Sequence, residues 1–460
     1  MPDLLHRLVV PPRLSLIYRA GESLGYNPAL NSWERLDGPT AETLRWLRAG
    51  REPTALPQQI QKRFGYSDAA AKERLAAIIN WCVLRRLLYL DRAAGLPART
   101  VPSNPLVTVY WICTQACNLR CTYCYQEATV ARSNELSTVE ATDVIEQIVQ
   151  AGVRTLVFTG GEPFMRRDLC ELARYAKSRG LRSTVITNGH FITRRNIGEV
   201  SQIFDLVTVS LDHVIEHYHD VRRGKGSWRH ALAAIDLLLE AGVPVDVNST
   251  LSRDALGQLT DLLRVRNTRR IGMHKIVPQF PMGRGADHRD DELTTAELLH
   301  LSDQLAQATR DAADGSKAFI KPEGTYSTKG KSRLHCGAGL SEVSIDPEGW
   351  VYPCKLLQYP EFRTQNVRNA RLADIYARHP LLSSVQAKVV ETLYPCKTCV
   401  IKNHCGGGCR GIHYSFSQQY DSADPLFCAY LRRSFEAQAW NSTGAIPASR
   451  KSQFFDSRQP

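Results

Sequence analysis

The sequence predicts an α/β protein built on a partial (β/α)6 TIM barrel, with a small winged-helix-like domain before it and a cysteine-rich domain after it. From Leu106 onward, short runs of β-branched and aromatic residues alternate with amphipathic helical patterns, which is typical of parallel strands joined by crossover helices. Six such strands can be found before about residue 285, too few for a closed eightfold barrel. A chain of 460 residues also has room for two or three domains.

The barrel is expected to occupy residues 106–312. In parallel barrels functional side chains follow the strand ends, so the strand positions decide where candidate residues are sought. Ser137 and Glu140 have the spacing of a capping box and predict a helix start after the first strand. A helix is also expected at 290–312. The expected strands are 107–113, 155–159, 183–187, 206–211, 243–251 and 273–277.

Residues 1–95 predict a separate domain. An extended stretch around Leu8–Tyr18 is followed by three short helical patterns, and Leu87–Leu90 predicts a closing strand. In the last helical pattern Ser67 suits an N-terminal cap. Strand, helices and closing strand together indicate a winged-helix-like module. The apolar face of that last pattern consists of Leu75, Ile78, Ile79 and Cys82.

Two segments without apolar periodicity flank these domains. The proline-bearing residues 97–105 predict a linker, and residues 441–460 predict a disordered tail. The chain contains neither an apolar run of about 18 residues nor a signal peptide, so a cytoplasmic protein with no membrane partner is expected. Its net charge of +12 suits an anionic surface, an acidic peptide or a nucleic acid. A nucleic acid is not expected, because no basic tract is interleaved with aromatic residues.

Thirteen cysteines in a reducing compartment indicate metal or redox chemistry. Cys82, Cys113 and Cys170 lie in apolar or periodic segments and are expected to be ordinary buried cysteines. Cys117, Cys121 and Cys124 follow the first strand as a C-x3-C-x2-C motif. Three thiolates can hold three irons of a four-iron cluster and leave the fourth iron open, which suits a chelating cofactor. The alternative is a zinc site.

The motif and two later strand ends together resemble the radical S-adenosylmethionine superfamily. The later strand ends carry Thr159-Gly160-Gly161-Glu162-Pro163 and Ser210-Leu211-Asp212. The resemblance implies that S-adenosylmethionine chelates the open iron and is cleaved to a 5′-deoxyadenosyl radical. His213 stands where the family usually has glycine. The further cofactor-binding residues that the resemblance implies are Tyr123, Gly160, Gly161, Glu162, Ser210, Asp212 and Arg222.

The later cysteines are Cys336, Cys354, Cys396, Cys399, Cys405, Cys409 and Cys428. Their order within residues 330–435 resembles the SPASM domain, which holds two auxiliary clusters, so three [4Fe-4S] clusters are implied in total. A hairpin turn signal, Asp346–Gly349, precedes Cys354. The alternative is a pair of zinc ribbons. The resemblance assigns Cys396, Cys399, Cys405 and Cys428 to one cluster, and Cys336, Cys354 and Cys409 to the other. The second set leaves either an open iron or an oxygen ligand such as Glu342.

The resemblance implies an oxidoreductase that modifies peptides. The leading hypothesis is a maturase of ribosomally made peptides (RiPPs) that abstracts a hydrogen from a precursor peptide and installs a carbon–carbon or thioether crosslink. The N-terminal domain would bind the leader peptide as an added strand, and a flavodoxin or ferredoxin would supply electrons. Two alternatives stay open: an anaerobic sulfatase-type maturase that generates formylglycine, and a non-enzymatic iron–sulfur sensor that binds DNA.

Overall fold

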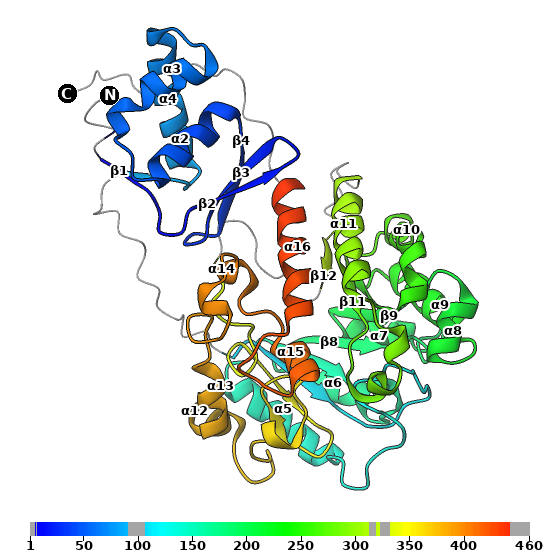
Figure 1. Ribbon diagram of the computed structural model, residues 1–460. Coiled ribbons are helices and arrows are strands. Elements are labelled where there is room, and N and C mark those ends of the chain that lie inside the picture. The colour runs from blue at the N-terminus through cyan, green and yellow to red at the C-terminus, as the bar shows by residue number, and fades with distance from the viewer. Residues whose placement is uncertain (1–4, 6, 91–105, 312–318, 323–331, 442–460) are drawn as a thin grey trace, which may run out of the picture.

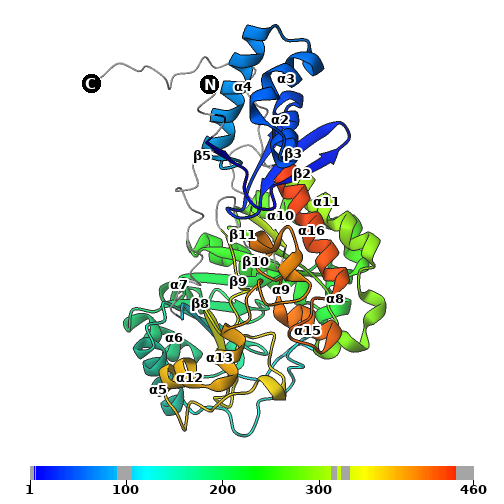
Figure 2. The same ribbon diagram turned by 60° about the vertical axis from the view of Figure 1, so that its left-hand side comes forward.

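The computed structural model describes residues 5, 7–90, 106–311, 319–322 and 332–441. Three sheets organise these residues: a nine-stranded sheet in the order β12-β11-β10-β9-β8-β7-β6-β13-β14, a three-stranded sheet β2-β3-β4 and a two-stranded sheet β1-β5. Figures 1 and 2 show the N-terminal elements to one side of the large sheet, with helix α16 reaching toward them.

The middle of the large sheet consists of the six predicted strands, which pair in parallel in chain order. The predicted open barrel is therefore confirmed. The capping box of Ser137 and Glu140 is present at the start of the first crossover helix. The strands are β6 (Thr108–Ile112), β7 (Thr155–Thr159), β8 (Arg182–Thr187), β9 (Leu206–Ser210), β10 (Val245–Leu251) and β11 (Met273–Pro278). The crossover helices are α5 (Thr138–Gln150), α6 (Leu169–Ser178), α7 (Ile197–Ile203), α8 (Glu216–Arg223), α9 (Ser227–Glu240) and α10 (Leu259–Arg269).

Strand β10 shows how the barrel separates its core from its interior. Its valines and leucine are buried, whereas the alternating Asp246, Asn248 and Thr250 are half-buried. Because successive side chains of a strand point to opposite faces, the apolar set packs against the helices and the polar set faces the barrel interior. The interior is thus lined by polar groups at the carboxyl ends of the strands.

Three strands extend the sheet beyond the six expected. Strand β12 (Phe319–Pro322) pairs in parallel with β11. On the opposite edge β13 (Glu342–Ile345) pairs in parallel with β6, and β14 (Val351–Tyr352) returns antiparallel to β13. The turn between β13 and β14 is the predicted Asp346–Gly349 turn. This hairpin ties the cysteine-rich region directly to the first barrel strand.

The N-terminal elements β1 to β5, which we call the N-terminal module, contain more strands than expected. The sequence predicted one extended stretch before the helices, but the structure has an antiparallel meander of three strands. Ala20 and Gly21, with φ of 45° and 82°, form the tight turn between the first two. The winged-helix comparison stays a prediction. The elements are β1 (Leu8–Val9), β2 (Ser15–Arg19), β3 (Glu22–Asn27), β4 (Ser32–Leu36), α2 (Gly38–Arg48), α3 (Leu56–Phe64), α4 (Asp68–Leu84) and β5 (Tyr89–Leu90).

The C-terminal part is more helical than its sequence suggested. Helix α11 (Thr295–Asp311) corresponds to the helix expected at 290–312, and α16 (Pro425–Asn441) packs along it through Ser302–Ser434 and Arg433–Asp303 contacts.

The predicted linker 97–105 and nearly all of the predicted tail lie outside the described residues. No helix in the described part of the chain is long and apolar enough to cross a membrane. The remaining helices are α12 (Leu372–Arg378), α13 (Pro380–Gln386), α14 (Lys402–Cys405) and α15 (Arg410–Ser417).

Candidate functional site

Loops at the carboxyl ends of the barrel strands enclose a cavity of about 220 Å³, which we call the barrel cavity. Cys117, Cys121 and Cys124, on the loop after β6, line one wall of it. Of the other residues predicted to bind the cofactor, Tyr123, Gly160, Gly161 and Ser210 also line this cavity. Glu162, Asp212 and Arg222 do not line it, and their side chains act behind its walls.

The two glycines are needed for contact between loops. A Cβ on Gly160 would lie 2.5 Å from the carbonyl oxygen of Thr114, and one on Gly161 would overlap the carbonyl of Ala116. The backbone N–H of Gly161 donates to Thr114, and that of Glu162 donates to Ala116. The loop after β7 is therefore fixed against the backbone that leads into Cys117. The sequence suggested only that glycines allow approach to a ligand, and the structure adds this packing requirement.

Glu162 holds a neighbouring loop in place. Its fully buried carboxylate accepts hydrogen bonds from Thr187 Oγ1 (2.8 Å), the N–H of Asn188 (2.8 Å) and the N–H of Phe164 (3.2 Å). Burial raises the pKa of Glu162 to about 7. Asn188 itself lines the barrel cavity and donates from Nδ2 to Asn118 Oδ1, between the first two cysteines. The turn Thr187-Asn188-Gly189 thus contributes to the wall of the cavity.

Asp212 forms hydrogen bonds to the cysteine loop, to α8 and to β10 behind the cavity wall. Its buried carboxylate accepts from Arg223 Nε (2.5 Å), from the N–H of Thr250 (2.9 Å) and from the Tyr123 hydroxyl. Burial disfavours the charged carboxylate, but the Arg223 guanidinium outweighs it and holds the pKa of Asp212 below its usual range. The aromatic residue of the cysteine motif is therefore anchored to β9 and β10.

Arg222, predicted to bind the cofactor carboxylate, points elsewhere. Its guanidinium donates to the carbonyl of Thr250 and to Gln279 Oε1, and it lies 4.5 Å from the centre of the Tyr123 ring. The adjacent Arg223 lines the barrel cavity instead. Arg222 therefore supports Tyr123, and of these two arginines only Arg223 lines the cavity.

Several lining residues were not singled out from the sequence. Asn248 and Thr250 come from the polar face of β10, and Lys275 from β11. Arg284 lines the cavity too and donates from its guanidinium to the carbonyls of Cys121 (2.9 Å) and Ala128 (3.2 Å). Polar residues at every second position of a buried strand were the signal that could have identified Asn248 and Thr250.

The charge of the barrel cavity is one-sided. Four basic side chains, Arg223, Lys275, Arg284 and Lys355, line it, and the described lining residues include no aspartate or glutamate. Anionic groups are therefore favoured inside it. An iron–sulfur cluster held by thiolates and a cofactor bearing a carboxylate are both compatible with this charge.

The cysteines fit a multi-iron cluster. Burial raises the pKa of the Cys117 thiol to about 11, so its thiolate needs a bound metal to be stable. Among the described residues no three Cys, His, Asp or Glu side chains lie close enough to hold a single metal ion. A four-iron cluster instead takes one thiolate on each iron. The thiol donors and the space between them are consistent with such a cluster, with S-adenosylmethionine on the open iron.

Four of the later cysteines surround a second, smaller cavity. Cys396 and Cys399 come from the turn before α14, Cys405 from the end of α14 and Cys428 from the first turn of α16. All four line this cavity, together with Arg432. Burial raises the pKa of Cys405 to about 12 and that of Cys428 to about 11. These are the four cysteines that the resemblance assigned to one auxiliary cluster, and we call this place the outer site.

The other three later cysteines line a third cavity of about 350 Å³, which we call the inner site. Cys336, Cys354 and Cys409 share this cavity with Glu342. Lys275, Lys355 and Leu356 line both the inner site and the barrel cavity. The inner site therefore adjoins the barrel cavity across these three side chains.

Comparison with known proteins agrees with this arrangement. The sequence matches the Radical SAM superfamily over residues 111–253 and the SPASM iron-sulfur cluster-binding domain over residues 336–400. An AdoMet-dependent heme synthase of Oleidesulfovibrio alaskensis is 29% identical over 74% of this chain and 92% of its own length. A PqqA peptide cyclase of Gluconobacter oxydans is 26% identical over 71% and 91%. The mycofactocin maturase MftC of Mycobacterium ulcerans is 29% identical over 69% and 87%.

Two solved structures share the fold. SuiB of Streptococcus suis bound to S-adenosylmethionine superposes with a TM-score of 0.58 at 15% identity, over 91% of this chain and 99% of SuiB. The anSMEcpe structure with bound AdoMet gives 0.61 at 18% identity, over 73% of this chain and 97% of anSMEcpe. Residues 1–105 are nearly a quarter of the chain. A match that omits only 9% therefore extends into the N-terminal module.

Proposed function

We propose that this chain, a radical S-adenosylmethionine enzyme with a SPASM domain, is a maturase of a ribosomally made precursor peptide. When bound at Cys117, Cys121 and Cys124, the cluster and S-adenosylmethionine would supply a 5′-deoxyadenosyl radical that removes a hydrogen atom from the substrate. The product would be a carbon–carbon or thioether crosslink, with electrons delivered by a flavodoxin or ferredoxin. Because the chain belongs to an enzyme family, the DNA-binding sensor is set aside.

The protein's own groups would position the reacting parts. Asp212 and Arg223 hold Tyr123, and with it the cysteine loop, against β9 and β10. Glu162 holds Asn188 at the cavity wall. The barrel cavity adjoins the inner site, so a peptide segment that enters from the SPASM side would pass between Lys275, Lys355 and Leu356. Two lysines at this passage favour a segment that carries a carboxylate.

The observation that carries the proposal is the open edge of the N-terminal sheet. Strand β2 lies at the edge of the sheet β2-β3-β4, and no described strand pairs with its outer side. An exposed strand edge can bind an extended peptide by main-chain hydrogen bonds. The peptide cyclase and the mycofactocin maturase are named for peptide and maturation chemistry. SuiB has also been solved with its precursor peptide SuiA, and that structure shares the fold at a TM-score of 0.59.

A second candidate is modification of a tetrapyrrole. Two observations support it. The chain is similar in sequence to a heme synthase, and the basic side chains of the barrel cavity suit a substrate that bears carboxylates. The heme synthase match covers 74% of this chain, whereas the SuiB match covers 91%. A leader-binding module would have no evident role with a porphyrin substrate, so the peptide maturase is favoured.

The test removes one hydrogen-bond donor from the open edge. Arg19 and Glu22 flank the two-residue turn and pair with each other, so by the alternation of an antiparallel ladder the N–H of Tyr18 points away from β3. Proline is tolerated on an edge strand where its missing N–H faces outward. Tyr18→Pro should therefore keep the fold and remove an N–H from the docking edge. Tyr18→Ala is the matched control, because it loses the same side chain and keeps that N–H.

Modification is measured by mass spectrometry with a precursor peptide encoded beside this gene. We expect Tyr18→Pro to lower modification at least tenfold relative to Tyr18→Ala, while 5′-deoxyadenosine formation without peptide is unchanged in both. Equal modification by the two variants would contradict leader binding at β2. Oxidation of a cysteine or serine of the peptide to formylglycine would support the sulfatase-type alternative. Consumption of a porphyrin with no change in the peptide would support the second candidate.

A further inference from the structure

The inner site offers three thiols, whereas a four-iron cluster has four irons to ligate. Among the described residues that line it, three have oxygen in their side chains: Tyr110, Ser341 and Glu342. At neutral pH a phenol and an alcohol keep their protons, whereas a glutamate is ionised. Glu342 is therefore the anionic oxygen donor of this lining.

The hairpin that carries Glu342 brings it to Cys354. Strand β13 begins at Glu342, and its partner β14 ends at Tyr352, two residues before Cys354. The register pairs Ser344 with Tyr352 and Ile345 with Val351. Continued by two residues, the same register sets Glu342 opposite Cys354. Opposed residues of an antiparallel pair point to the same face, with Cβ atoms about 4.5–5.5 Å apart.

Backbone hydrogen bonds also tie Glu342 to the segments that carry Cys336 and Cys354. The N–H of Glu342 donates to the carbonyl of Gly337 at 3.2 Å, and the N–H of Gly339 donates to the carbonyls of Glu342 at 2.9 Å and Pro353 at 2.7 Å. Gly337 follows Cys336, and Pro353 precedes Cys354. The four potential ligands therefore border one cavity.

The surroundings are suited to an anionic cluster. Lys275, Lys355, Arg333 and Arg410 line the inner site, and Arg333 donates from Nη2 to the carbonyl of Cys336 at 3.0 Å. A cluster held by three thiolates and a carboxylate is anionic, and cations around it stabilise it. These cations also define the alternative role for Glu342, in which it forms an ion pair with one of them and does not bind iron.

We propose that Glu342 is the fourth ligand of the cluster at the inner site, which is thus held by Cys336, Cys354, Cys409 and one carboxylate. The inference concerns cluster ligation and does not depend on the identity of the substrate. A carboxylate on the fourth iron would close that position against solvent and small anions, so this cluster would have no open coordination position.

The test uses the Cys117/Cys121/Cys124→Ala variant, in which only the inner and outer sites can load. The parent, Glu342→Ala and Glu342→Cys are reconstituted with ⁵⁷Fe and examined by Mössbauer and electron paramagnetic resonance spectroscopy, with and without cyanide. We expect the parent to be insensitive to cyanide and to show about one iron in eight with an oxygen-ligated signature. Glu342→Ala should gain a cyanide-dependent shift in one cluster, and Glu342→Cys should lose the oxygen signature and stay insensitive.

Glu348→Ala is the matched control, because it removes a carboxylate from the same hairpin that pairs with Arg132 at 2.8 Å. It should leave both spectra unchanged. The proposal would be overturned if Glu342→Ala gave the same spectra as Glu348→Ala and the parent. Cyanide binding to the parent would also overturn it. If Glu342→Ala fails to load one cluster, recovery of the iron by Glu342→Cys supports ligation, and no recovery contradicts it.

Discussion

At the residue scale, the support of Tyr123 depends on which way two adjacent arginines point. Arg222 and Arg223 end α8, and consecutive helical residues project about 100° apart. Arg223 turns to Asp212 and the barrel cavity, and Arg222 turns to the carbonyl of Thr250 and the face of the Tyr123 ring. The cavity thus gains a cation that is already paired, which fixes its position before any cofactor binds.

The sequence singles out Tyr123 and Asp212 because each belongs to a short motif at a strand end, but it does not show that the two are hydrogen-bonded to each other. It could not distinguish Arg222 from Arg223, since the rotation of α8 is set by its packing against α9. Glu162 was singled out as a cofactor contact, and the structure adds that its carboxylate accepts three hydrogen bonds from protein groups. Motif spacing identifies the loop and leaves open which atoms face inward.

Glu162 should give the protein a measurable pH dependence. Its folded pKa of about 7 lies above an unfolded value of about 4.3, so the unfolded chain ionises first as the pH rises. Its contribution to stability therefore falls between about pH 4.3 and 7, by up to about 4 kcal/mol. Glu162→Gln removes this slope. We expect the thermal midpoint of wild type to fall relative to that of Glu162→Gln as the pH rises from 5.5 to 8.

The control for this measurement is Glu140→Gln. Hydrogen bonds from Arg368 and Ser137 lower the pKa of Glu140 to about 2, so its stabilisation is complete above about pH 4.3 and is lost only as the pH falls toward 2. The difference in thermal midpoint between wild type and Glu140→Gln should stay flat from pH 5.5 to 8. A flat difference for Glu162→Gln as well would show that burial does not keep Glu162 protonated.

At the element scale, each cysteine set is presented by a different kind of support. A single loop after β6 carries the first set, the β13–β14 hairpin and its surroundings carry most of the inner set, and α14 and α16 carry half of the outer set. The six barrel strands were predictable because their apolar runs are regular. The meander β2-β3-β4 was missed because Gly25, Asn27 and Pro28 interrupt its pattern, although Tyr26 and Trp33 are fully buried. Helix α16 was missed because its apolar residues face both α11 and the N-terminal module.

The loop after β6 should hold its cluster independently of the other two. Cys117/Cys121/Cys124→Ala should lose about a third of the iron, because one of three four-iron sites loses all its thiolates. It should also lose all cleavage of S-adenosylmethionine, measured as 5′-deoxyadenosine. Cys113→Ala is the control: Cys113 is buried four residues earlier and does not line the barrel cavity, so iron and cleavage should be retained. Cleavage by the triple variant would contradict the assignment of the cofactor site.

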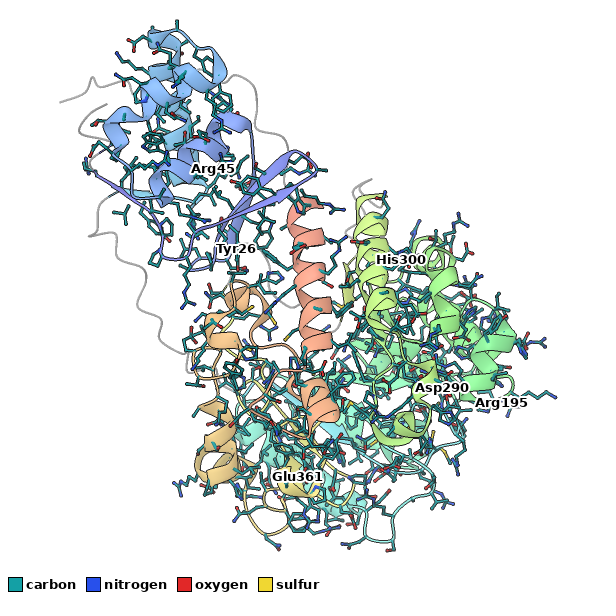
Figure 3. All side chains as sticks on the ribbon, in the orientation of Figure 1. Tyr26, Arg45, Arg195, Asp290, His300 and Glu361 are labelled. Carbon is teal, nitrogen blue, oxygen red and sulfur yellow. The ribbon has the colours of Figure 1, made fainter. Side chains whose placement is uncertain are left out.

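At the scale of the whole molecule, α16 joins three parts of the chain. Its first turn carries Cys428 of the outer site, and its middle packs on α11 of the barrel. Its last turns bring Phe435 and Trp440 into one buried cluster with Leu24, Tyr26 and Trp33 of the N-terminal module. Figure 3 labels Tyr26 at this junction, where its ring centre lies 4.8 Å from that of Phe435. One helix therefore joins the N-terminal module to the outer site.

This connection predicts the effect of Trp33→Ala. Trp33 is fully buried, and its ring lies edge-on to those of Phe435 at 5.4 Å and His404 at 5.6 Å, so truncation should cost about 3–5 kcal/mol. Most of that loss falls on the junction, because Phe435 and His404 belong to the C-terminal helices. We expect faster hydrogen exchange in the last turns of α16 and in β3 and β4, with 5′-deoxyadenosine formation retained and peptide modification reduced.

Trp46→Ala is the matched control, since Trp46 packs within the module on α2 and donates to the carbonyl of Glu52. If Trp33→Ala leaves exchange in α16 as slow as Trp46→Ala does, the module is not held through this cluster, and its link to the outer site must run through another contact, such as that of Arg13 with the carbonyl of Lys397.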